Sequence, residues 1–173
     1  MMQFGEAPMF PHLDGSAPDL KKGEAKLNRW EIDLNSNSGS IKKNYLDDSI
    51  GEFPRLDERK SMSKYRYGYY ASNNGESPKG VSFNSITSYD FETDKKDSFT
   101  LSEFDAVGEP IFVPKSLSAN EGEGYLLSLA FLGQENRSDL MIFDAENISS
   151  GPIAKAKLPH RVPYGFHGNW RQG

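Results

Sequence analysis

The residues of this chain best suited to hold a metal ion are its three histidines, His12, His160 and His167. A neutral imidazole offers one ring nitrogen to a metal, and its other ring N–H has to be held by an acceptor. The chain contains no cysteine, which excludes disulfides, thiolate metal sites and cysteine nucleophiles. Three scattered histidines cannot easily close a metal site by themselves. We therefore expect any such site to recruit carboxylates or residues outside this sequence.

Two of the three histidines lie in the last sixteen residues, LPHRVPYGFHGNWRQG, with two prolines and three aromatic residues. Gly165 and Gly168 lie close to His167 and have no side chain, so they would let the backbone pass near a crowded centre. This composition is typical of a functional site. The competing interpretation is a lone histidine at a strand end, packed in the core or exposed to solvent.

The rest of the chain predicts β-strands, and helical periodicity is almost absent. Residues 27–34 alternate apolar and polar side chains, and the Asn-, Ser- and Gly-rich residues 35–40 predict a turn before a return strand at 41–46. The continuously apolar residues 125–132 predict a strand buried on both faces. A single helical turn is expected near 144–149. Further strands are expected at 65–71, 85–92, 98–101, 110–114, 138–144 and 152–158.

These segments repeat loosely along the chain. The first set begins with GEFP at 51–54 and the second with GEPIFVP at 108–114, and Glu52 and Glu109 are 57 residues apart. Antiparallel units that recur at this spacing are typical of β-propeller blades, and a β-sandwich is the alternative. The chain has material for two or three blades, whereas a propeller needs at least about four to close. We therefore expect these residues to be part of a longer protein.

Composition and charge exclude several classes of protein. The sequence has 173 residues, of which 36% are hydrophobic, and this is enough for a globular core. A net charge of −5 offers no basic surface for nucleic acid. The first residues, MMQFGEAPMF, do not resemble a signal peptide, and no stretch approaches the roughly 18 apolar residues of a spanning helix. We expect a cytoplasmic protein that at most contacts a membrane peripherally.

Several motifs together resemble one known family. LPHRVPYGFHGNW, GEPIFVPK, YLLSLAF, DLMIFDAENI and, further upstream, GEFPRLD with YRYGYYAS are similar to the C-terminal part of the carotenoid cleavage oxygenases. That family includes apocarotenoid and lignostilbene dioxygenases and the retinal pigment epithelium isomerase. The ordered matches span residues 27–170, and as a set they are highly specific.

The resemblance implies an all-β fold, the C-terminal blades of a seven-bladed β-propeller that is incomplete in this chain. Residues 1–173 would form one C-terminal fragment of the propeller domain, with a loop-rich opening at 1–25 and two to three antiparallel blades at 26–173. It also implies a nonheme Fe(II) held by four histidines. The last of these lies in a Phe-His-Gly motif, which matches His167. Family members hold such ligands through glutamates, one of them in a Glu-Phe-Pro motif that matches Glu52, and we expect Glu52 to bond His167 itself.

The implied reaction is cleavage of a carbon–carbon double bond of a carotenoid, apocarotenoid or stilbene by O₂. No catalytic residue beyond the metal site is implied, and Phe166 is a candidate to line the substrate tunnel. With one ligand of four, the chain alone is expected to be inactive. An alternative is a metal-free β-rich binding or interaction module derived from propeller blades. A third interpretation is a carbohydrate-binding β-sandwich, suggested by the aromatic residues 65–70.

Overall fold

The computed structural model describes residues 1–3, 10–19, 24–35, 39–73 and 83–171. It is built from β-strands, and the helical elements among the described residues are two 3-10 turns. The all-β class expected from the sequence is therefore confirmed. No helix among the described residues is long and apolar enough to cross a membrane. The chain divides into two compact units, Met1–Glu52 and Phe53–Gly173, which are described separately.

The first unit is a small antiparallel sheet. It contains β1 (Met2–Gln3), β2 (Lys26–Ile32) and most of β3 (Ile41–Leu56), with Met2 opposite Leu27 and Ile32 opposite Ile41. The Trp30 indole N–H donates to Gln3 Oε1 at 3.2 Å. The predicted hairpin is thus present, although residues 36–38 of its turn lie outside the described residues.

The second unit starts with the last residues of β3 and contains all the remaining elements. These are η1 (Glu58–Lys60), β4 (Tyr67–Asn73), β5 (Ser85–Asp90), β6 (Lys95–Thr100), β7 (Ala106–Val107), β8 (Ile111–Pro114), β9 (Gly124–Leu132), β10 (Arg137–Asp144), η2 (Ile148–Ser150) and β11 (Pro152–Lys157).

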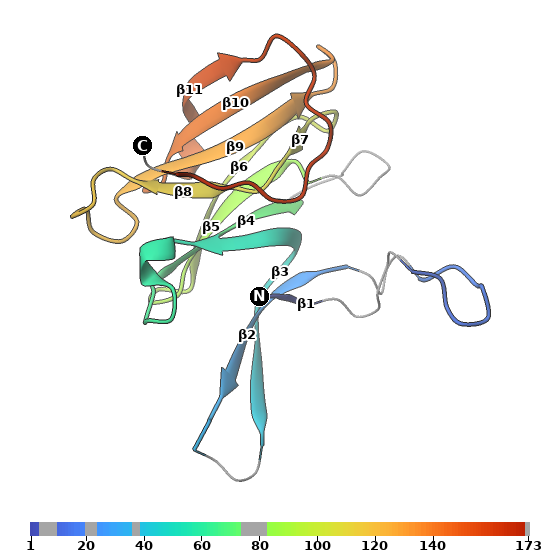
Figure 1. Cartoon of the computed structure of the whole chain (residues 1–173), viewed down its shortest axis with the longest axis vertical. Helices are drawn as coiled ribbons and strands as arrows, with labels where there is room; N and C mark the ends of the chain where they lie inside the picture. The colour runs from blue at the N-terminus through green and yellow to red at the C-terminus, as the bar shows by residue number, and fades with distance from the viewer. Residues whose placement is uncertain (4–9, 20–23, 36–38, 74–82, 172–173) are drawn as a thin grey trace. The chain divides into compact units, whose positions relative to one another are not determined.

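These strands form two similar antiparallel sets. The end of β3 is followed in one sheet by β4, β5 and β6 in that order. In the other sheet β8 pairs with β9, β9 with β10, and β10 with β11 (Figure 1). Each set is a meander in which neighbours in sequence are neighbours in space. This arrangement agrees with the repeat seen in the sequence.

The core of the second unit lies between the two sets. The rings of Tyr69 on β4 and Phe112 on β8 stack with centroids 5.5 Å apart and planes at 3°. Phe99 on β6 packs against Phe143 on β10 at 5.6 Å, and Phe143 is fully buried. Aromatic pairs of this kind add specific contacts to the area they bury. The two sets are therefore joined by side-chain packing between their faces.

Two expectations about individual strands were wrong. Buried and half-exposed residues alternate along β9, and Leu129 is 41% exposed, so only one of its faces is buried. The unbroken apolar run hid this alternation because both faces carry apolar side chains. β3 extends ten residues beyond the predicted return strand, through Gly51 and Pro54.

Candidate metal-ligand site

The candidate site begins at a β-bulge that presents Glu109. Val107 of β7 pairs with Ala130, and Ile111 of β8 pairs with Leu127 on the same edge of β9. Val107 and Ile111 are four residues apart, whereas their partners Ala130 and Leu127 on β9 are three residues apart. The chain between β7 and β8 therefore contains one extra residue. Pro110 has no N–H to donate to a ladder, so the edge breaks here. A bulge changes the direction in which a side chain points. The Glu109 side chain that it presents is 5% exposed.

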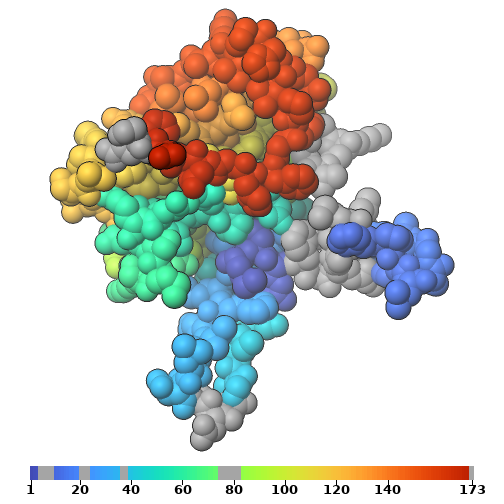
Figure 2. Space-filling model, in the orientation of Figure 1, coloured from blue at the N-terminus to red at the C-terminus, as the bar shows by residue number. Residues whose placement is uncertain are grey.

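The second part of the site is the irregular segment of residues 158–171, which follows β11. In Figure 2 it forms a continuous band over the surface of the second unit. Leu158 N–H donates to Ser138 O at 3.0 Å, and Val162 N–H donates to Ser138 Oγ at 2.9 Å. The Tyr164 ring contacts Phe131 on β9 edge-on at 6.3 Å. These contacts direct the chain back toward β8 and the bulge.

His167 meets Glu109 where the segment reaches the bulge. Its Nδ1 lies 3.2 Å from Glu109 Oε1, and the next backbone N–H, of Gly168, donates to Glu109 Oε2 at 2.8 Å. An ionised carboxylate only accepts hydrogen bonds, so this contact favours the neutral tautomer with the hydrogen on Nδ1 and the lone pair on Nε2. The imidazole is 73% exposed. The site thus holds one imidazole at Nδ1 and leaves most of its ring exposed.

Phe53 supports the same imidazole from another side. Its ring lies edge-on to His167, with centroids 5.8 Å apart and planes at 89°. Phe53 has a φ of 56°, in the left-handed region that costs a non-glycine residue backbone energy. Such a conformation persists only where the surroundings hold it, and it is often found at sites.

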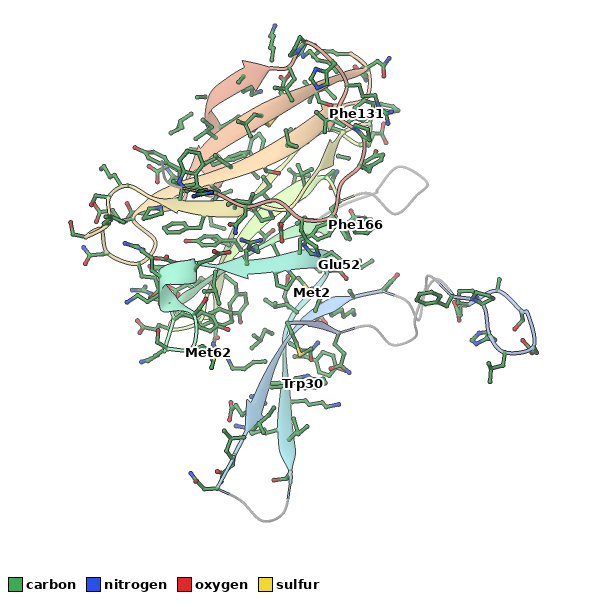
Figure 3. The ribbon with its side chains drawn as sticks, viewed as in Figure 1. Met2, Trp30, Glu52, Met62, Phe131 and Phe166 are labelled. Atoms are coloured by element: carbon green, nitrogen blue, oxygen red, sulfur yellow. The ribbon has the colours of Figure 1, made fainter. Side chains whose placement is uncertain are left out.

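The structure places the other predicted site residues as follows. Glu52 is the last residue of the first unit, on β3, and it is partly buried (Figure 3). The carboxylate in contact with His167 Nδ1 is that of Glu109, to which the sequence analysis gave no role. The role of Glu52 stays a prediction. Phe166 is 69% exposed on the C-terminal segment, and its place in a tunnel also stays a prediction.

The expectations about residues near His167 agree with the structure at some positions and differ from it at others. An added Cβ at Gly168 would lie 2.9 Å from Ile111 Cδ1, so the close approach expected there exists. Gly165 faces open space, and the same expectation was wrong for it. Trp170 is 50% exposed in the described chain. His12 and His160 are both exposed.

The described side chains offer a single candidate metal ligand at this site, His167. Among the residues that the structure describes, no group of three or more His, Asp and Glu side chains could enclose a metal ion. His167 nevertheless has the arrangement of a ligand, because a carboxylate holds one ring nitrogen and leaves the other free. The described residues thus offer this imidazole to a metal and do not enclose a site by themselves.

Known proteins resemble this chain over nearly its whole length. The family described as "Retinal pigment epithelial membrane protein" matches residues 3–172. The chain is 38% identical over 168 residues to isoeugenol monooxygenase from Pseudomonas nitroreducens, covering 93% of the chain and 35% of that protein. It therefore spans about a third of the length of the relatives it matches.

Solved structures give the same result. Lignostilbene dioxygenase from Pseudomonas brassicacearum matches with a TM-score of 0.87 and 33% identity, over 95% of this chain and 36% of that one. The cobalt-substituted apocarotenoid oxygenase (ACO) from Synechocystis matches with a TM-score of 0.80 and 30% identity, over 87% and 31%. The expected β-propeller blades are confirmed by this likeness. The chain belongs to the carotenoid oxygenase family that includes the retinal pigment epithelial membrane protein.

Proposed function

We propose that the full-length protein is a nonheme Fe(II) oxygenase that cleaves a carbon–carbon double bond. The reaction consumes one O₂ and converts the two alkene carbons into two carbonyl groups. The observation that carries the proposal is the His167 imidazole, which contacts the buried Glu109 carboxylate through Nδ1 while its side chain is 73% exposed. Membership of a family with oxygenases among its relatives, one solved with cobalt in place of its metal, supports the same assignment.

The iron would supply the activation of O₂. The residues of this chain would position it. His167 Nε2 would be one of its ligands, and Glu109 would keep the hydrogen on Nδ1, which makes the imidazole a better donor. Gly168 N–H on the other oxygen of Glu109 limits rotation of the carboxylate. The Phe53 ring, perpendicular to the imidazole with centroids 5.8 Å apart, would limit its tilt.

The proposed substrate is a stilbene or another conjugated alkene, such as an apocarotenoid or carotenoid. The relatives described above are named for isoeugenol, lignostilbene and apocarotenoid, so an alkene conjugated to an aromatic ring or polyene is common to them. We propose that Phe166 contacts this apolar substrate, because its ring is exposed beside His167. We propose that Glu52 orients a ligand imidazole.

The decisive experiment is His167→Ala in the full-length protein. We expect loss of iron binding and of double-bond cleavage, measured by metal analysis and by chromatography of products from a lignostilbene-type alkene. His160→Ala is the matched control, because His160 lies in the same segment and is exposed. It should leave both quantities unchanged. Wild-type iron content in the His167 variant would refute the assignment.

The metal-free binding module is the alternative function, and the same measurements distinguish it from the oxygenase. A full-length wild-type protein that takes up no iron and cleaves no alkene would favour the module.

The lipophilic class of substrate also motivates the proposal of peripheral membrane contact in a cytoplasmic protein. Liposome flotation tests it, and a protein that stays in the soluble fraction would contradict it.

A further inference from the structure

Arg55 joins the elements that present His167. It lies near the end of β3, within the second unit, and its side chain is 17% exposed. Its Nη1 lies 3.2 Å from Glu109 Oε1 and donates to the carbonyl oxygen of Gly168 at 3.2 Å. Its Nη2 donates to Asn169 Oδ1 at 3.3 Å and pairs closely with Glu58. One guanidinium thus contacts the carboxylate behind His167 and the two residues after it.

This network leaves the Glu109 carboxylate little freedom. Oε1 forms an ion pair with Arg55 Nη1 and lies within hydrogen-bond distance of His167 Nδ1, and Oε2 accepts from Gly168 N–H. A carboxylate that is 5% exposed is costly unless a cation and hydrogen bonds compensate for the lost water. Arg55 supplies that cation. Its planar fork can reach acceptors on both sides at once, which a lysine ammonium cannot do.

We propose that Arg55 is the positioning residue that sets the direction of the His167 imidazole. It does so through two contacts, by orienting Glu109 and by holding the Gly168–Asn169 backbone that follows the histidine. The proposal deepens the proposed function, since the direction of Nε2 matters for a metal. The claim about the direction of the imidazole can also be tested on the iron-free protein.

Arg59 offers a matched control four residues further along the chain. It pairs with Asp57, which is 1% exposed, at 2.6 Å between Nη2 and Oδ2. Its Nη1 donates to the carbonyls of Ser116, Leu117 and Ala119. These contacts tie η1 to the loop after β8. Arg59 therefore has a buried carboxylate partner and several backbone acceptors, as Arg55 does, while its contacts serve another loop.

The experiment measures the tautomer of His167 in the full-length, iron-free protein with ¹⁵N-labelled histidine. The His167 signal is assigned by its loss in His167→Ala, and spectra are recorded where imidazole is neutral. We expect the wild type to carry its hydrogen on Nδ1 and Arg55→Met to show a mixture of tautomers. Arg55→Lys should restore part of the Nδ1 form, because it returns the charge beside Glu109 without the fork. Arg59→Met should match the wild type.

Iron release from the loaded protein to a chelator is the second measurement. Arg55→Met should release iron about tenfold faster, at the lower end of the effects of groups that orient metal ligands. Arg59→Met should change the rate by less than about twofold. An unchanged tautomer in Arg55→Met would overturn the proposal, and so would equal effects of the two methionine variants. If Arg55→Met does not fold, a wild-type tautomer and release rate in Arg55→Lys would overturn it.

The two proposals can fail independently. If His167→Ala keeps its iron while Arg55→Met alters the tautomer, the metal assignment is wrong and the positioning role of Arg55 stands. If His167→Ala loses iron while Arg55→Met leaves the tautomer unchanged, the metal assignment stands and the positioning role is wrong.

Discussion

The β8–β11 sheet and the segment of residues 158–171 are held in place by different forces. The sheet has continuous strand ladders and a buried apolar face, on which Met141 and Phe143 are completely buried. The segment has mostly exposed side chains and is held at separate points by Ser138, Glu109 and Arg55. Hydrophobic burial therefore stabilises the scaffold, while a few polar contacts fix the imidazole. Substitutions in the sheet should therefore change the stability of the fold, and substitutions at the polar contacts of the segment should change the hold on the imidazole.

The largest expected effect tests the scaffold. Phe143→Ala removes a ring that is 0% exposed and packed against Phe99, so it should lower the free energy of unfolding by about 3–5 kcal/mol. Phe166→Ala is the matched control, because the same truncation at a ring that is 69% exposed should cost less than about 0.5 kcal/mol. Urea denaturation measures both. Equal losses would contradict the division between scaffold and segment.

The next effect tests the site without disturbing the scaffold. Glu109→Gln keeps the shape of the side chain and removes its charge, so the hold on His167 Nδ1 weakens. Iron release from the full-length protein should become about a hundredfold faster, the upper end for partners of metal ligands. Glu123→Gln is the control, because Glu123 accepts from Asn120 N–H in an exposed turn. Unchanged iron retention in Glu109→Gln would refute the role of this carboxylate.

A smaller or equal effect is expected at Glu52. Glu52→Gln should weaken iron retention by about ten- to a hundredfold if Glu52 orients a ligand imidazole. Combined with Glu109→Gln, the two effects should multiply if the glutamates hold different imidazoles. Metal analysis after dialysis measures the outcome. Full iron occupancy in Glu52→Gln would dismiss its role.

The smallest effect concerns charge on the scaffold. Hydrogen bonds from Arg137 lower the pKa of Asp139, with Nε 2.7 Å from Oδ1. A carboxylate whose pKa is lower in the folded protein stabilises it above its ordinary value of about 3.8, and this contribution is lost as the pH falls further. In Asp139→Asn, the unfolding free energy should therefore fall less steeply with decreasing pH below about pH 4 than in the wild type. Urea denaturation at several acidic pH values checks this, and an unchanged slope would contradict it.

The sequence predicted the regular parts of the fold well because alternation and turn residues are local signals. β2, β5 and β10 appear close to their predicted ranges. β7, two residues long, gives no such signal. Glu109 was missed for a related reason, since its role arises from pairing between distant parts of the chain. The Gly-Glu-Pro sequence and its repeat correspondence with Glu52 were the available signals of a bulge.

His167 could be selected among the three histidines only through its family motif. Its spacing from other residues contains no information on the carboxylate that it meets, 58 positions earlier in the chain. The network of Arg55 was equally hidden, because its acceptors at Gly168 and Asn169 are more than a hundred residues away. Long-range polar contacts of this kind leave no periodic pattern in a sequence.

Phe53 shows that folding and function make opposite demands at a single residue. With a φ of 56°, the backbone at this position would suit a glycine, and the exchange would relieve about 1 kcal/mol or more of backbone strain, but it would also remove a ring that packs against Phe83 and the core. The same ring lies perpendicular to the His167 imidazole. A design that replaced Phe53 to relieve its backbone would therefore give up core packing together with the contact to the imidazole.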